Sequence, residues 1–81
     1  MFINKGSNGE NNICGKKVAE LRKQMGKSQR ELAAALQLLG LDVDKNAVQR
    51  IEAGKRFVTD IEIVFLSKAL NITVNELLGV K

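Results

Sequence analysis

One stretch of the sequence, between Asp44 and Gly54, has the side chains needed to recognise a ligand through paired hydrogen bonds. Asp44 is suited to begin a helix there, and Gly54 to end it. Successive residues of a helix turn by about 100°, so Val48 and Ile51 mark the buried side. The opposite side is polar and almost free of acid, with a cation at its flank. Its residues are Lys45, Asn46, Gln49, Arg50 and Ala53.

This face has the chemistry that reads DNA bases. Amide side chains pair bidentately with adenine in the major groove, and Arg or Lys pairs with guanine. We therefore predict base reading by Lys45, Asn46, Gln49 and Arg50. The alternative is an ordinary solvated face, because long polar residues cover most helix exteriors.

Cations and amides on either side of this helix could contact the phosphates of the same DNA. A helix starting at Ser28 would offer the backbone N–H groups of its first turn to an anion. The candidates for phosphate contact are Lys27, Gln29, Arg30, Lys55 and Arg56.

Arg22 and Glu52 lie at the borders of the apolar stripes of their helices. This placement favours a structural ion pair between the two helices, which would make Arg22 a poor candidate for direct contact with DNA. The alternative, in which each side chain faces solvent, stays open.

The chain has 81 residues, enough for one modest core and too few for a second domain. It has no Pro and is rich in helix-favouring residues, which predicts an all-α fold. Residues 1–56 carry eleven Lys or Arg against six acids, whereas residues 57–81 carry two against three. The basic surface therefore belongs to the first three helices.

The composition argues against several classes of protein. With no His and a single Cys, Cys14, the chain has neither a His general base nor the usual Cys/His zinc ligands. We expect no enzyme activity, metal site, cofactor or small-molecule effector. The sequence has no apolar run of membrane-spanning length and no signal peptide, which predicts a cytoplasmic protein. Residues 1–12 are expected to be a flexible arm, followed by one domain at residues 13–81.

Five helices are predicted from periodicity and capping signals. Cys14, Val18, Leu21 and Met25 recur at helical spacing before Gly26. Capping boxes, in which a hydroxyl and a carboxylate satisfy each other's backbone amides, are expected to start the second, fourth and fifth helices. They are Ser28 with Glu31, Thr59 with Glu62, and Thr73 with Glu76. The buried stripe of the second helix is expected to be Leu32, Ala33, Leu36 and Leu39.

Three segments together resemble the helix-turn-helix family of the phage Cro and CI repressors, the XRE family. They are GKKVAELRKQMGKSQRELAAAL, NAVQRIEAGKR and LSKALNITVNELL, and the resemblance covers Cys14 to Leu78. It implies a compact five-helix bundle like the lambda-repressor DNA-binding domain, with the second and third helices as the DNA-binding motif. It also implies base contacts by Lys45, Asn46 and Arg50, a phosphate or base contact by Gln29, and a structural Arg22–Glu52 pair.

The connection between the second and third helices departs from this pattern. The span from Leu36 to Val48 is several residues longer than in common members of the family. Its apolar residues are Leu38, Leu39, Leu41 and Val43, and they predict an extended second helix followed by a packed loop.

We expect sequence-specific binding of double-stranded DNA by a homodimer that regulates transcription, as a repressor. The dimer surface is expected around the fifth helix, although the apolar residues there could instead complete the core. They are Phe57, Phe65, Ile72, Val74, Leu78 and Val80. The alternative function is an antitoxin, anti-repressor or co-regulator that acts mainly through protein contacts.

Overall fold

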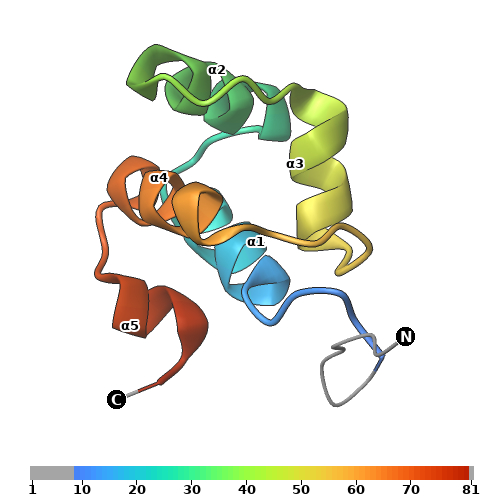
Figure 1. Ribbon diagram of the computed structural model, residues 1–81. Coiled ribbons are helices and arrows are strands. Elements are labelled where there is room, and N and C mark those ends of the chain that lie inside the picture. The colour runs from blue at the N-terminus through green and yellow to red at the C-terminus, as the bar shows by residue number, and fades with distance from the viewer. Residues whose placement is uncertain (1–8, 81) are drawn as a thin grey trace.

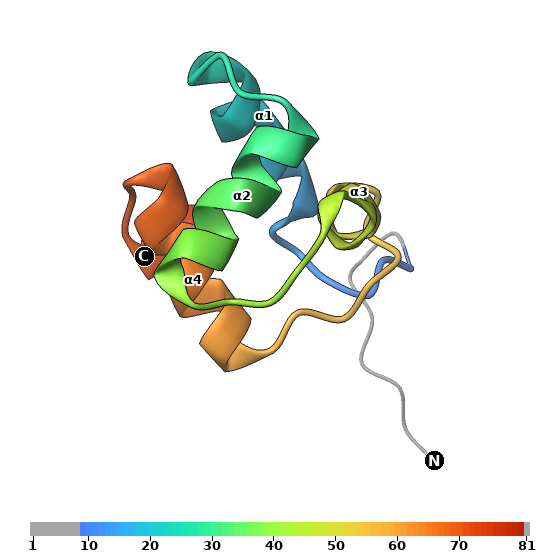
Figure 2. The same ribbon diagram turned by 90° about the horizontal axis from the view of Figure 1, so that it is seen from above.

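Five helices make up the described part of the chain, residues 9–80 of this computed structural model (Figure 1). They are α1 (Gly15–Gln24), α2 (Gln29–Leu39), α3 (Lys45–Glu52), α4 (Asp60–Leu70) and α5 (Val74–Leu78). Seen from above, α3 is viewed along its axis while α2 lies across the view, so these two helices cross steeply (Figure 2). The all-α five-helix prediction is confirmed.

The helices begin where local hydrogen bonds can satisfy their exposed amides. In the box that starts α2, Ser28 Oγ accepts from the Glu31 amide at 3.1 Å and Glu31 Oε1 accepts from the Ser28 amide at 2.9 Å. Equivalent boxes start α4 and α5. The Ser28 hydrogen bonds hold the pKa of the Glu31 carboxyl below its usual value. All three predicted capping boxes are present.

One cluster of buried residues holds the five helices together. Helix α4 packs against α1, α2 and α5, and α3 packs against α1 and α2. The predicted core residues Val18, Leu32 and Leu36 have no exposed surface, and neither does Cys14 at the start of α1. Burial raises the pKa of the Cys14 thiol. The buried apolar residues are Cys14, Val18, Leu32, Ala33, Leu36, Val43, Val48, Ile51, Leu66, Leu70 and Leu77.

Two residues assigned to apolar stripes are not in the core. Met25 and Leu39 are 41% and 43% exposed. Each lies at the carboxyl-terminal end of its helix, where Met25 is the C-cap of α1 and Leu39 is the last residue of α2. The apolar periodicity of each helix continues past the point at which neighbouring helices can cover it, so Met25 is uncovered and the prediction that Leu39 is buried is wrong.

The long connection between α2 and α3 is partly packed. Gly40 adopts a φ of 108°, a left-handed conformation that closes α2, and the Leu41 amide donates to the Leu36 carbonyl at 3.0 Å. Gln37 Nε2 donates to the Val43 carbonyl at 2.7 Å, and the Val43 side chain is buried. The packed loop is therefore confirmed at Leu41 and Val43. Leu38, in contrast, is 90% exposed on the last turn of α2.

The residues expected at a dimer surface differ in burial, and Val74 among them is half-buried. Phe65, Ile72 and Leu78 pack against the core, which agrees with the alternative that they complete it. Phe57 and Val80 remain 56% and 51% exposed.

The segment before α1 differs from the predicted flexible arm at its end. Asn11 and Asn12 are hydrogen-bonded to the backbone after α3, so these two residues belong to the folded domain. Residues 1–8 of the predicted arm lie outside the described residues.

Residues 9–80 lack both a membrane-spanning helix and a cluster of metal ligands. Every helix there falls short of the length and apolar character that a membrane span requires. Within the same residues, no three His, Cys, Asp or Glu side chains gather closely enough to hold a metal ion.

Candidate nucleic-acid interface

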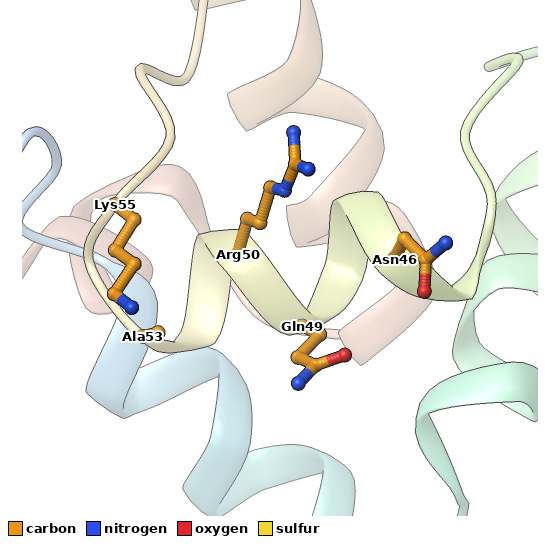
Figure 3. Close-up of a pocket in the computed structure, with 5 residues that line it drawn as sticks. All are labelled: Asn46, Gln49, Arg50, Ala53 and Lys55. Atoms are coloured by element: carbon orange, nitrogen blue, oxygen red, sulfur yellow. The ribbon is translucent and has the colours of Figure 1, made fainter.

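The outward face of α3 presents the residues singled out in the sequence. Asp44 Oδ1 caps the helix by accepting from the Ala47 amide at 2.8 Å, and Val48 and Ile51 anchor its inner side in the core. The side chains of Lys45, Asn46, Gln49 and Arg50 are exposed. A pocket on this face is lined by Asn46, Gln49, Arg50, Ala53 and Lys55 (Figure 3).

Figure 3 shows how these side chains are distributed. Asn46 lies near the amino-terminal end of α3, Arg50 and Gln49 extend to opposite edges of the face, and Lys55 approaches from the turn after the helix. The pocket contains amide and cationic groups and no carboxylate. Such a surface can donate hydrogen bonds to base edges or phosphates at several points along one helix.

Arg22 and Glu52 form the predicted ion pair between α1 and α3. Arg22 Nε lies 2.6 Å from Glu52 Oε2, and Arg22 Nη2 donates to Glu52 Oε1 at 3.0 Å. The third guanidinium nitrogen, Nη1, donates to the Lys27 carbonyl at 2.8 Å. The hydrogen bond to Glu52 raises the pKa of Arg22 further, which keeps it charged. This arrangement ties α3 to α1 and to the turn that precedes α2.

Gln29 has a partner inside the protein. Its Nε2 donates to Glu52 Oε1 at 3.0 Å, so the side chain of this residue, which was expected to contact a phosphate or a base, joins the Arg22–Glu52 pair. Gln29 and Arg30 are the first two residues of α2, so their backbone amides have no acceptors within their own helix. Lys27 is half-buried and Arg30 is exposed beside these amides.

Arg56 is also paired within the chain. Its Nη1 lies 2.9 Å from Glu62 Oε2, and the Glu62 side chain is largely buried at the start of α4. Predicting Arg56 as a phosphate contact overlooked this partner, because six residues and a turn separate the two side chains. Lys55, one residue earlier, is exposed.

Asn11 and Asn12 also contact this region, although they were not among the predicted site residues. Both donate hydrogen bonds to carbonyl groups at the end of α3 and in the turn after it. Composition gave no signal of this role, because an Asn-rich segment is also typical of a flexible chain.

Comparison with known proteins agrees with this arrangement. A helix-turn-helix family model matches residues 18–77, which include all of α2, α3 and α4. The chain belongs to the XRE-type helix-turn-helix family. Proteins of this family regulate transcription and are not enzymes. A search of curated protein sequences finds no match.

The chain is similar to several solved structures of regulators. The restriction-modification controller protein C.AhdI from Aeromonas hydrophila is 34% identical, with a TM-score of 0.69 over 79% of this chain and 89% of that one. The clp gene regulator ClgR from C. glutamicum is 23% identical, with a TM-score of 0.72 over 85% of this chain and 83% of that one. The hypothetical transcription factor NHTF from Neisseria is 18% identical, with a TM-score of 0.73 over 95% and 88% of the two chains. The latter two support the fold, and the domain is a DNA-binding helix-turn-helix similar to controller proteins.

Proposed function

We propose that this domain binds double-stranded DNA in a sequence-specific manner, with α3 in the major groove, and that its occupancy of an operator represses transcription. The observation that carries the proposal is the outward face of α3. Its exposed Asn46, Gln49 and Arg50 project from a helix whose inner side, at Val48 and Ile51, is fixed in the core. A rigid helix can hold such side chains in register with successive base pairs.

Within this proposal the residues divide between bases and phosphates. Asn46 and Gln49 suit adenine, whereas Lys45 and Arg50 suit guanine. Lys27, Arg30 and the Gln29 amide suit a phosphate at the start of α2. Lys55, in the turn after α3, suits another phosphate. Arg56 instead fixes the turn after α3 through Glu62.

We further propose a homodimer, because one recognition helix contacts too few bases for useful selectivity. Helix α4 supplies a surface that can match a second copy of itself. Ile61 and Val64 are 64% and 44% exposed on α4, and Asp60 and Lys68 lie one turn before and one turn after Val64. If a two-fold axis passes near Val64, two antiparallel α4 helices bring Asp60 of each copy toward Lys68 of the other.

The test of DNA reading is selection from a pool of random duplexes, with sequencing of the retained molecules at two salt concentrations. The wild-type chain should enrich a two-fold symmetric motif, with affinity that falls steeply as salt rises. A variant with Asn46→Ala and Arg50→Ala should lose the motif, because each lost base contact removes about 1–3 kcal/mol of discrimination.

The matched control carries Lys16→Ala and Asn75→Ala. It removes one cation and one amide from exposed positions of α1 and α5, and α5 packs against α1 and α4. It should enrich the same motif as the wild-type chain. Weak binding that selects no sequence and is unchanged by Asn46→Ala and Arg50→Ala would reject base reading and favour function through a protein partner.

The test of the dimer surface is sedimentation equilibrium with Val64→Asp. Two carboxylates facing each other across the axis should shift the chain to monomer and abolish binding to the symmetric motif. A Val64→Asp chain that remains dimeric would place the interface elsewhere.

A further inference from the structure

We propose that Asn12, assisted by Asn11, is a positioning residue for DNA binding. In this inference, the two asparagines hold the turn after α3 so that the exposed Lys55 side chain stays beside the outward face of α3. The inference deepens the proposed function and rests on it.

The Asn12 side chain joins three parts of the fold. Its Nδ2 donates to the Ile51 carbonyl at 3.1 Å and to the Arg56 carbonyl at 2.8 Å. Its Oδ1 accepts from the Gly15 amide at 2.8 Å. The last turn of α3, the following turn and the first turn of α1 are therefore held by one amide group.

Asn11 continues the same pattern along the turn. Its backbone amide donates to the Gly54 carbonyl at 2.7 Å, and its Nδ2 donates to the Lys55 carbonyl at 2.8 Å. Together with the Asn12 bond to Arg56, the two asparagines satisfy three consecutive carbonyls. Carbonyls beyond the end of a helix receive no hydrogen bond from that helix, and without another donor they bond to water. The asparagines thus replace solvent with fixed donors.

The packing around this contact leaves the turn little room to move. A Cβ atom on Gly15 would lie 2.2 Å from the Ile51 carbonyl oxygen, so α1 begins directly against the end of α3. On the other side, Arg56 is paired with Glu62 at 2.9 Å. The Lys55 amide also donates to the Arg50 carbonyl at 3.0 Å. The backbone of Lys55 is bonded at both its amide and its carbonyl.

The Lys55 side chain is nevertheless exposed and lines the pocket beside Arg50 (Figure 3). A fixed backbone with an exposed cation lowers the ordering cost of a phosphate contact, because the chain is already in its bound conformation. The asparagines therefore act on DNA binding through the position of Lys55.

The test compares the salt dependence of DNA affinity in Asn12→Ala, Lys55→Ala and the double variant, using the duplex enriched by the wild-type chain. Loss of one phosphate contact lowers the slope of log affinity against log salt by about 0.9 per protomer. We expect this decrease in each single variant and no further decrease in the double variant. The enriched base sequence should stay unchanged, because the outward face of α3 is intact.

Thr73→Ala serves as the stability control. It removes the hydrogen bond from the Glu76 amide to the Thr73 hydroxyl, which caps α5. Helix α5 contacts α1 and α4, so this bond lies away from the turn after α3. Its salt slope should equal that of the wild-type chain. Where Asn12→Ala fails to fold, Asn12→Ser supplies a second variant, because its hydroxyl can accept from Gly15 but is too short to bridge two carbonyls.

Two results would overturn the inference. One is an Asn12 variant that folds and keeps the wild-type salt slope, which would leave the asparagines a purely structural role. The other is a double variant whose slope falls twice as far as in either single variant, which would show that Asn12 and Lys55 act independently. Failure of the proposed function is distinguishable, because the wild-type chain would then enrich no sequence.

Discussion

Replacement of Arg22 by Ala should destabilise the fold more than replacement of any exposed cation. The change removes two hydrogen bonds to Glu52 and one to the Lys27 carbonyl, at 2.6, 3.0 and 2.8 Å. The side chains of Arg22 and Glu52 are only 12% and 8% exposed, so water replaces these bonds poorly. The Glu52 carboxylate would keep the Gln29 amide as its remaining partner.

These contacts set the expected magnitude. Removing one partner of a buried pair costs about 3–5 kcal/mol, whereas exposed pairs contribute about 0–1 kcal/mol. The low exposure places Arg22→Ala near the first range, and the remaining Gln29 bond reduces the cost. We expect a loss of about 2–4 kcal/mol, against a total of about 4–12 kcal/mol for a chain of this size. The midpoint of thermal unfolding should fall by roughly 10–25 °C.

The assay is thermal and urea unfolding followed by far-UV circular dichroism, since the chain has no Trp or Tyr to report by fluorescence. Arg30→Ala is the control, because Arg30 is exposed and its loss should change stability by no more than about 0.5 kcal/mol. A double-mutant cycle with Glu52→Ala isolates the coupling between the two residues. If Arg22→Ala unfolds within about 0.5 kcal/mol of the wild-type chain, the pair does not hold α1 to α3.

Three further predictions concern other parts of the fold. The buried Cys14 thiol, with its raised pKa, should react with a thiol reagent only as fast as the chain unfolds; rapid labelling under native conditions would contradict its burial. Gly15→Ala should lower the urea midpoint more than Gly26→Ala. The new Cβ at Gly15 would clash with the Ile51 carbonyl, whereas at Gly26 it has open space and strains only the left-handed backbone conformation. Equal midpoints would refute the contact at Gly15. The lowered pKa of Glu31 means that its stabilising effect is complete above its ordinary pKa of 4.5 and is lost as pH falls through the lower folded value. Glu31→Gln should therefore show a smaller loss of stability on acidification, measured by urea unfolding, and an unchanged loss would rule out this contribution.

The helices and the chemistry of the α3 face could be predicted from the order of the residues alone. Ser28 and Glu31, like the other capping partners, lie three residues apart, so the hydrogen bonds that begin a helix are fixed by local chain geometry. The outward direction of Asn46 and Arg50 follows equally from the helical period once Val48 is assigned to the core. The Arg22–Glu52 pair spans thirty residues, yet border positions on two apolar stripes were enough to predict it.

The partners of the remaining polar groups depend on how the helices pack together. Arg56 and Gln29 resemble free surface residues in the sequence, but the fold brings Glu62 and Glu52 to them. Leu38 and Leu39 look like core residues because nothing in the sequence shows that the end of α2 is not covered by neighbouring helices. Asn12 was the least predictable, since its acceptors are backbone carbonyls. Every residue carries such a carbonyl, so only the approach of α1 to the end of α3 determines which carbonyls it meets.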